Sequence, residues 1–205
     1  GDVTIVSDSG AIAISSGAWE YVTAGVADAA SPSTGQLGTR VVITGSLLRG
    51  GGAEVVEVTL LNVAAEITSE NDTHVEVVAA TGPNSAATGD VVLTSDSGAV
   101  TTQKSSWTYL KPGVILLVSP DEGQVDTEVS ITGTSMCGGG NKIVSVTLLG
   151  KAATIKQDNC NLVKVKAGDV GGGRTGDVVL ISDTGAVVTG TDAFTYNGVG
   201  NITDV

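Results

Sequence analysis

The sequence predicts an all-β fold built from repeated domains, and three observations lead to that prediction. One stretch of residues occurs three times, as GDVTIVSDSGAI from residue 1, GDVVLTSDSGAV from residue 89 and GDVVLISDTGAV from residue 176. Val, Thr, Ile and Leu gather between clusters of Gly, Asn, Asp and Ser, which is typical of strands separated by turns. Within the apolar stretches, apolar and polar residues alternate, as they do in a half-buried strand.

The repeat has a period of about 87 residues, which is within the size range of an independent domain. SPSTGQLGTRVVITG (31–45) matches SPDEGQVDTEVSITG (119–133), and EVTLLNVAAEI (57–67) matches SVTLLGKAATI (145–155). Each copy ends in an aromatic-x-Tyr pair, so these aromatic residues are expected in the core or closing strand of each domain. The pairs are Trp19 and Tyr21, Trp107 and Tyr109, and Phe194 and Tyr196.

This register divides the chain into four parts. Residues 26–112 and 113–199 each contain a complete domain. Residues 1–25 contain only the closing hairpin of a truncated domain, and residues 200–205 only the opening strand of another. Neither end can bury a core alone, so we expect the sequence to be a window on a longer array, or a neighbouring chain to supply the missing strands.

Comparison of the two complete copies predicts which strand residues are buried. In RVVIT (40–44) and EVSIT (128–132), the second and fourth positions stay apolar while the others vary. The same test on residues 73–79 and 161–167 buries the valines and exposes His74, Glu76 and their lysine counterparts Lys164 and Lys166. The predicted buried residues are Val41, Ile43, Val129, Ile131, Val75, Val77, Val163, Val165, Val56, Val58, Leu60, Val144, Val146 and Leu148.

The repeated stretch itself predicts a β-hairpin. In DVVLTSDSGAVTT a strand leads to a turn at Asp96-Ser97-Gly98, and Gly98 stands where a three-residue loop favours positive φ. The returning strand runs on to Trp107 and Tyr109, whose rings fall on one face. We therefore expect this hairpin to close each domain.

The order of motifs resembles the IPT/TIG family of immunoglobulin-like domains. Both copies have an apolar stretch with Ser-Pro (VILLVSPDEG in the second), then TEVSITG or its equivalent, a pair of strands around VTLLGKAATI, then GDVVL and aromatic-x-Tyr. The resemblance implies tandem Greek-key β-sandwiches in an elongated array, with interaction or spacing roles and no catalysis. One departure is that Leu47-Leu48 and Ser135-Met136 stand where the family usually has an aromatic residue, so packing there is expected to differ.

Residues that carry catalysis are scarce in this chain. The single histidine, His74, lies on the exposed face of a strand, and Leu162 replaces it in the next copy. Without a base near Ser or Cys, no nucleophilic triad can be assembled. The Gly runs at 49–52, 137–140 and 171–174 lack the Lys-Ser/Thr of a phosphate-binding loop. The sequence therefore predicts no enzyme activity and no cofactor.

The net charge and the hydropathy of the sequence limit the kinds of partner that the chain is expected to bind. Asp and Glu number 22 against 10 Lys and Arg, a net charge of −12, which argues against nucleic-acid binding. Asp8, Asp96 and Asp183 recur at the hairpin turn, but each stands alone, so we interpret them as turn formers and not as calcium ligands. No apolar run reaches the roughly 18 residues of a membrane span, so direct membrane insertion is not expected.

Two features favour an extracellular or cell-surface location. Asn71-Asp-Thr and Asn201-Ile-Thr are N-glycosylation sequons, and Cys137 and Cys160 are an even pair with spacing suited to a disulfide. Use of the sequons stays open, and the alternative for the cysteines is two separate buried thiols.

The repeat provides an independent argument for the disulfide. Cys137 corresponds to Arg49 and Cys160 to Asp72, so one copy has two thiols where the other has a cation and an anion. Both substitutions are explained if the two positions are neighbours in space. We therefore predict a Cys137–Cys160 disulfide, with Arg49 and Asp72 close enough for an ion pair.

Two functions of different classes fit these observations. The first is a structural segment of a long extracellular or cell-surface repeat protein, acting as spacer, adhesive stalk or filament backbone. Its partners would be neighbouring modules of the same chain, further copies in a fibre, or other surface proteins. The second is an accessory carbohydrate- or protein-binding module of a secreted enzyme or receptor, which for a sugar would need exposed aromatic rings. We favour the first because the recurring aromatic residues are expected inside.

Overall fold

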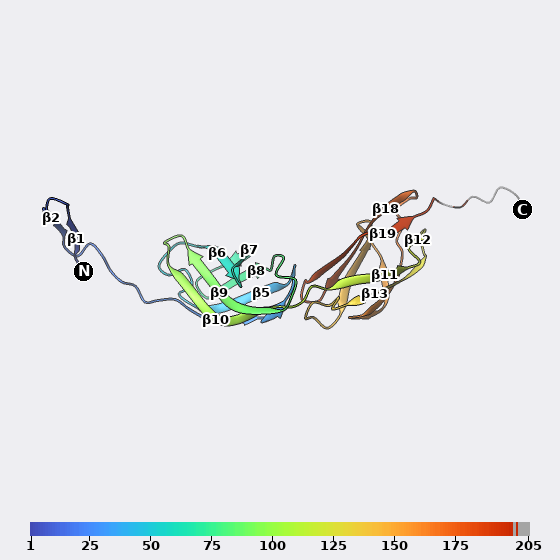
Figure 1. The fold of residues 1–205 in the computed structure, drawn as a ribbon, viewed down its shortest axis with the longest axis horizontal. Coiled ribbons are helices and arrows are strands. Elements are labelled where there is room, and N and C mark those ends of the chain that lie inside the picture. The colour runs from blue at the N-terminus through green and yellow to red at the C-terminus, as the bar shows by residue number, and fades with distance from the viewer. Residues whose placement is uncertain (199, 201–205) are drawn as a thin grey trace, which may run out of the picture.

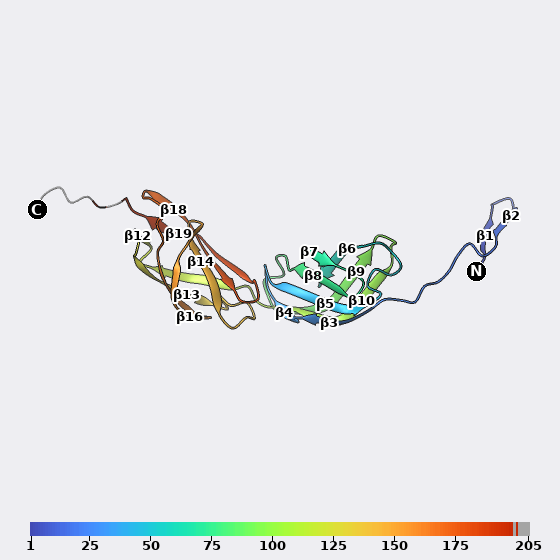
Figure 2. The same cartoon turned by 180° about the vertical axis from the view of Figure 1, so that it is seen from behind.

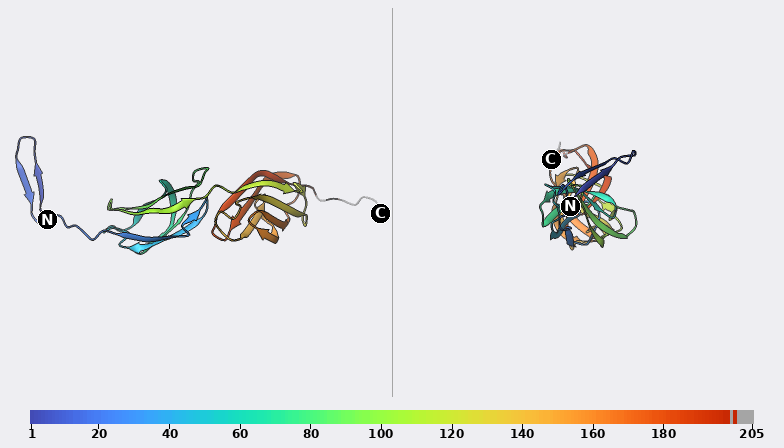
Figure 3. Two further views of the ribbon diagram at one scale, coloured as in Figure 1. Left: turned by 60° about the horizontal axis from the view of Figure 1, so that its bottom comes forward. Right: turned by 90° about the vertical axis from the view of Figure 1, so that its left-hand side faces the viewer.

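The computed structural model describes residues 1–198 and residue 200, and this part of the chain is all-β. Two β-sandwiches follow one another along the long axis, and a separate β-hairpin projects from the first of them (Figures 1 and 2). Seen along that axis, the two sandwiches overlap closely (Figure 3, right). The tandem immunoglobulin-like sandwiches in an elongated array that the sequence predicts are therefore present. Within the described residues, no helix is long and apolar enough to cross a membrane.

The first sandwich, here called module 1, begins at Val26 and ends at Tyr109. Its strands form one continuous sheet that folds into two layers, in the order β3-β5-β8-β7-β6-β9-β10-β4. The long strand β7 joins the layers, because its first residues pair with β6 and its last residues pair with β8. The strands are β3 (Val26–Ser31), β4 (Thr34–Gly35), β5 (Arg40–Ser46), β6 (Val55–Leu60), β7 (Val63–Glu70), β8 (His74–Val78), β9 (Ala87–Ser95) and β10 (Val100–Tyr109).

The second sandwich, module 2, begins at Val114 and ends at Tyr196, with two separate sheets. Their orders are β11-β13-β17-β16 and β12-β19-β18-β14-β15. The counterpart of β7 is divided at Ala153 into β15 and β16, so the sheets are not joined. The strands are β11 (Val114–Ser119), β12 (Glu122–Gly123), β13 (Glu128–Thr134), β14 (Ile143–Leu148), β15 (Lys151–Ala152), β16 (Thr154–Asn159), β17 (Leu162–Lys166), β18 (Arg174–Ser182) and β19 (Val187–Tyr196).

Each module has its own hydrophobic core. The closing aromatic pair lies at the centre of it, with Trp107 and Tyr109 at 0 and 1 % exposure in module 1 and Phe194 and Tyr196 at the same values in module 2. In both pairs the rings are perpendicular, with centroids 5.5 and 5.1 Å apart, an arrangement that aromatic quadrupoles favour. Val, Ile, Leu and Ala fill the remaining space.

The predicted burial holds at all but two of the fourteen positions. The predicted valines and isoleucines of β5, β8, β13 and β17 are all buried, and Leu48 and Met136 are buried where the family usually has an aromatic residue. The prediction is wrong at Val56 and Val144, which are 52 and 51 % exposed, while Val55 and Ile143 are buried instead. A β-bulge between Val55 and Glu57, and the matching one in β14, reverses the alternation there. Lys166, predicted to be exposed, is half-buried.

The N-terminal hairpin pairs β1 (Val3–Val6) with β2 (Ile12–Ser15). The expectation that Trp19 and Tyr21 are core residues is wrong for the described part of the chain, where they are 56 and 90 % exposed. Their rings still form a perpendicular pair, with centroids 5.9 Å apart. The two rings are exposed because none of the described strands covers this hairpin.

The repeated stretch is explained by two hydrogen-bond patterns that all three copies share. First, the Asp that follows the initial Gly accepts the N–H of the residue fifteen positions later, which has positive φ. In modules 1 and 2 this bond lies at a bulge in the returning strand. Second, a Gly at φ +80 to +89° closes the turn by donating its N–H to the carbonyl of the Ser three residues before it. The first set of bonds is Gly17 N to Asp2 Oδ1 (2.9 Å), Ser105 N to Asp90 Oδ1 (2.8 Å) and Asp192 N to Asp177 Oδ1 (2.9 Å).

Candidate functional site

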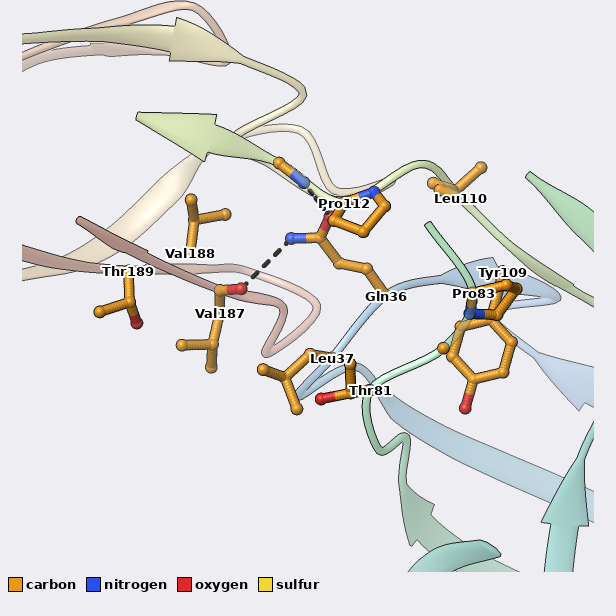
Figure 4. Close-up of a pocket in the computed structure, with 12 residues that line it drawn as sticks. Gln36, Leu37, Thr81, Pro83, Tyr109, Leu110, Pro112, Val187, Val188 and Thr189 are labelled. Carbon is orange, nitrogen blue, oxygen red and sulfur yellow. Dashed lines mark hydrogen bonds between the residues drawn. The ribbon is translucent and has the colours of Figure 1, made fainter. Parts of the chain in front are cut away.

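The candidate functional site is the junction between the two modules, and Gln36 is its central side chain. Gln36 is 3 % exposed. Its Oε1 accepts the Gly113 N–H at 2.7 Å, and its Nε2 donates to the Val187 carbonyl at 3.3 Å (Figure 4). One side chain of module 1 thus binds both the linker and the first residue of β19.

Main-chain bonds connect the same two loops. Val187 N donates to the Leu37 carbonyl at 2.8 Å, and Arg40 N donates to the Thr184 carbonyl at 2.9 Å. The hairpin turn of module 2 therefore docks on the loop before β5. Together with the part-buried bonds of Gln36, these bonds restrict rotation of one module against the other, since each must be broken for the modules to turn.

Close approach at the junction depends on two glycines. A Cβ on Gly38 would lie 2.6 Å from Val187 Cγ2 and 2.7 Å from the Gly185 carbonyl oxygen. A Cβ on Gly185 would lie 2.8 Å from the Gly38 carbonyl oxygen. Both residues have positive φ, +85° and +89°. The two loops can pack at this distance only because neither carries a side chain at these positions.

A cavity of about 180 Å³ lies beside these bonds and is mostly apolar. Leu37, Pro83, Leu110 and Val187 contribute to its walls (Figure 4). The Tyr109 side chain also lines it; its hydroxyl has no hydrogen-bond partner in the described part of the structure, and burial raises its pKa above the usual value. The cavity contains no acid–base pair or nucleophile, so the junction is suited to holding two domains together.

The predicted disulfide is present in module 2. Cys137 and Cys160 are bonded, with their Cα atoms 5.0 Å apart. The bond joins the loop after β13 to the turn between β16 and β17, across 23 residues of sequence. Closing a loop of this size stabilises a domain by about 3 kcal/mol in the chain-entropy account.

The equivalent positions of module 1 are neighbours, as predicted, but the ion pair of Arg49 is with Glu70 and not with Asp72. The Asp72 carboxylate accepts the backbone N–H of Arg49 at 3.0 Å. The Arg49 guanidinium instead binds Glu70 in a bidentate pair, at 2.7 and 3.0 Å. Glu70 also accepts the Val55 N–H at 3.1 Å, and this bond holds its carboxylate beside the loop. The Arg49 hydrogen bond lowers the pKa of Glu70.

Asn71 lies in an exposed turn. Its Oδ1 accepts the N–H groups of Thr73 and His74 and the Thr73 hydroxyl, each at 2.9 Å. Asn159 makes the same turn in module 2 without a sequon. The turn therefore accounts for this asparagine, and glycosylation stays a prediction. The second sequon, Asn201, lies outside the described residues.

The recurring aspartates of the hairpin turn have a structural partner. Asp96 Oδ1 accepts the Ala53 N–H at 2.9 Å, and Asp183 Oδ1 accepts the Asn141 N–H at 3.0 Å. Each carboxylate thus anchors the glycine-rich loop of its own module. In the described residues no group of three or more His, Cys, Asp or Glu is arranged to hold a metal ion.

The short linker between Tyr109 and Val114 predicts end-to-end stacking with restricted hinge motion, but sequence reasoning did not identify the residues of the junction. Gln36 is matched by Gln124 in the other copy, so comparison of the copies drew no attention to it. The available signal was the difference at the next-but-one position, where Gly38 of module 1 is replaced by Asp126. That contrast marks the loop that is packed against a neighbour.

Comparison with known proteins gives the family of module 1. The family model described as the IPT/TIG domain matches residues 26–109. Residues 26–109 are an IPT/TIG domain. Module 2 has the same succession of strands and the same buried aromatic-x-Tyr pair. The sequence has no match among curated proteins.

Among solved structures, the plexin A4 extracellular region is similar in fold, with a TM-score of 0.51 and 19 % identity. The match covers 90 % of this chain but 16 % of that one. A weaker likeness, with a TM-score of 0.34 and 16 % identity, links the chain to a protein of a xyloglucan utilization locus in Bacteroides uniformis. It covers 84 % of this chain and 50 % of that protein.

Proposed function

We propose that this chain is a structural, non-catalytic segment of a long extracellular or cell-surface repeat protein, acting as a spacer or stalk. The observation that carries the proposal is the junction, where a buried glutamine and two main-chain bonds lock successive IPT/TIG-type modules end to end. A spacer needs a fixed length, and a hydrogen-bonded junction provides one.

The disulfide and the fold likeness to an extracellular region support the proposed location. Disulfides persist in oxidising compartments, and Cys137–Cys160 is closed. The net charge of −12 favours solubility and disfavours nucleic-acid partners. The partners of this segment would be neighbouring modules, further copies in a fibre, or other surface proteins.

The alternative function, carbohydrate or protein binding as an accessory module, gains one observation. Trp19 and Tyr21 are exposed, as a sugar platform requires. Their rings are perpendicular, however, in the arrangement that the buried pairs of both modules adopt. A platform presents a flat ring face, so we favour the structural role. Glycan-array binding that disappears in Trp19→Ala would reverse this preference.

Small-angle X-ray scattering of the full chain at several temperatures tests the spacer function. A stalk should keep one elongated envelope, with the same maximum dimension until a module unfolds. Scattering that requires a mixture of extended and bent forms would refute it. A variant with Gln36→Ala is the informative comparison, because it removes the bridging side chain and leaves both cores intact.

A further inference from the structure

Module 2 has a groove along one side of its sandwich. It lies between β11 and β19, encloses about 500 Å³, and is open to solvent. One wall is β11, where Leu116 and Leu117 are 68 and 58 % exposed. The other wall is β19, from Thr189 to Ala193.

In module 1 a side chain closes the same place. Gln103 Nε2 donates to the carbonyl of Asp28 at 2.6 Å and so bridges β10 to β3. The equivalent residues of module 2 are Gly190 and Leu116. Gly190 has no side chain to make the bridge, and a leucine stands in place of an aspartate. The groove is therefore open, and its rim is more apolar than in module 1.

The walls of the groove offer backbone groups for strand pairing. β19 pairs with β18 along one edge, but β12 covers its other edge only at Thr195 and Tyr196. Residues 188–193 have no strand on that edge in the described structure. On the opposite wall, Leu116 is the extra residue of a bulge between the paired residues Ile115 and Leu117. An unpaired edge of this kind accepts an added strand, and Leu116 and Leu117 give it an apolar neighbour.

The charge of the groove selects the partner. Asp121 and Asp192 both line it, and no Lys or Arg is among its lining residues. Both carboxylates belong to exposed residues. A segment that enters the groove therefore gains from a basic residue at its end.

We propose that this groove of module 2 binds an extended segment of another polypeptide. The segment adds to the outer edge of β19 in line with β12. Alternate apolar side chains pack on Leu116 and Leu117, and a Lys or Arg lies beside Asp121 and Asp192. Backbone pairing supplies the affinity, and the leucines and carboxylates supply the specificity. The proposal does not rest on the spacer function, although Thr189 lines both this groove and the junction cavity.

The test titrates the isotope-labelled full chain with a synthetic peptide, acetyl-Lys-Val-Thr-Val-Thr-Val-Lys-amide, and follows amide chemical shifts. We expect shifts in β11, β12 and β19, with none in β3 or β10. Replacing both lysines by glutamate should weaken binding several-fold, more strongly at low salt. Methylation of alternate peptide nitrogens should weaken it by about tenfold or more, since strand pairing needs those donors.

Two sets of variants use the repeat as a control. Leu116→Asp with Leu117→Ala introduces the residues of module 1 at exposed positions and should abolish the shifts, while the rest of the spectrum stays unchanged. Gln103→Gly with Asp28→Leu should create weaker peptide-induced shifts in module 1, because Ser33 and Ser105 stand where module 2 has Asp121 and Asp192. The proposal is overturned if the methylated peptide binds equally well, if the shifts lie outside the groove, or if millimolar peptide gives none.

Discussion

Modules 1 and 2 have the same arrangement of strands and differ in the bonds that join one pair of loops. In both, the loop after β5 or β13 lies beside the turn before β8 or β17. Module 2 joins these segments with the covalent Cys137–Cys160 bond. Module 1 uses Asp72, which accepts the Arg49 N–H, and a bidentate Arg49–Glu70 pair. The contact is therefore a property of the fold, and its chemistry is free to change.

The two modules also share one hydrogen bond close to this contact. Val55 in module 1 and Ile143 in module 2 each donate a backbone N–H to a carboxylate, Glu70 and Asp158. This bond starts β6 and β14 in the same place. The Val55 N–H holds the Glu70 carboxylate beside Arg49, so the two side chains can pair. Sequence comparison of positions 49 and 72 alone does not reveal this third residue.

The largest expected effect comes from removing the disulfide. Cys137→Ala with Cys160→Ala should destabilise module 2 by about 3 kcal/mol, because the unfolded chain regains the entropy of an open loop. Module 1 should be unaffected, since its core is separate. Hydrogen exchange on the full chain, which reports each module by itself, measures both values.

A second double variant sharpens this result. Cys137→Arg with Cys160→Asp copies the residues of module 1 and places the arginine near Asp158. It should recover only part of the lost stability, because partly exposed ion pairs contribute little. Full recovery of stability would show that the ion pair stabilises the module as much as the disulfide does, and that loop closure contributes nothing.

The next effect concerns the junction. Gly38→Asp gives module 1 the residue that module 2 carries at this position, where Asp126 adopts φ +71°. The backbone tolerates Asp there, but the new Cβ would overlap Val187 and the Gly185 carbonyl. Overpacking of this kind costs about 1–3 kcal/mol, so the docked arrangement should be lost while both modules stay folded.

Residual dipolar couplings distinguish the two outcomes. The unmodified chain should fit one alignment tensor for both modules, and Gly38→Asp should need two. Asp126→Gly is the matched control, because it makes the reverse change away from the junction. A single tensor in Gly38→Asp would contradict the role assigned to Gly38.

A smaller effect tests the shared bulge bond. Asp177→Ala removes the acceptor of the Asp192 N–H and should cost module 2 about 1 kcal/mol. Asp90→Ala removes the same bond from module 1 and also the ion pair with Lys104, whose hydrogen bond lowers the Asp90 pKa. The loss should therefore be larger in module 1. Equal losses, measured by chemical denaturation of each module, would show that Lys104 contributes nothing.

Much of the fold could be predicted because the repeat supplied an internal comparison. Alternation identified the buried positions of β5 and β8, where pairing is regular. It failed at Val56, because a bulge shifts the alternation by one residue and leaves no compositional sign. The predicted burial of Trp19 and Tyr21 was wrong for another reason. Burial of these rings depends on a second sheet and not on the hairpin that carries them.

The candidate site was harder to predict than the fold. The disulfide followed from two substitutions in register, so its residues were identified correctly. The junction follows from a contact between modules, which no periodicity within one module encodes. The groove of module 2 depends on the loss of a side chain at Gly190, since both modules have the bulge, at Asp28 and at Leu116. The sequence shows the exchange of Gln103 for Gly190, but only the structure shows that Gln103 bridges β10 to β3.

The smallest effect is the pH dependence of module 1. Glu70 has a lowered pKa in the folded state, chiefly through the Arg49 hydrogen bond, so its ionised form stabilises the fold. That contribution is complete above the ordinary Glu pKa of about 4.5 and is lost as the pH falls through the lowered value. Module 1 should therefore lose stability on acidification in this window, and Glu70→Gln should remove that part of the dependence without affecting module 2. Hydrogen exchange of the β6 and β7 amides between pH 5 and about 3 measures it. If Glu70→Gln leaves the acid sensitivity of module 1 unchanged, the Arg49–Glu70 pair is a surface contact of no energetic weight, and of the two contacts only the disulfide stabilises its module.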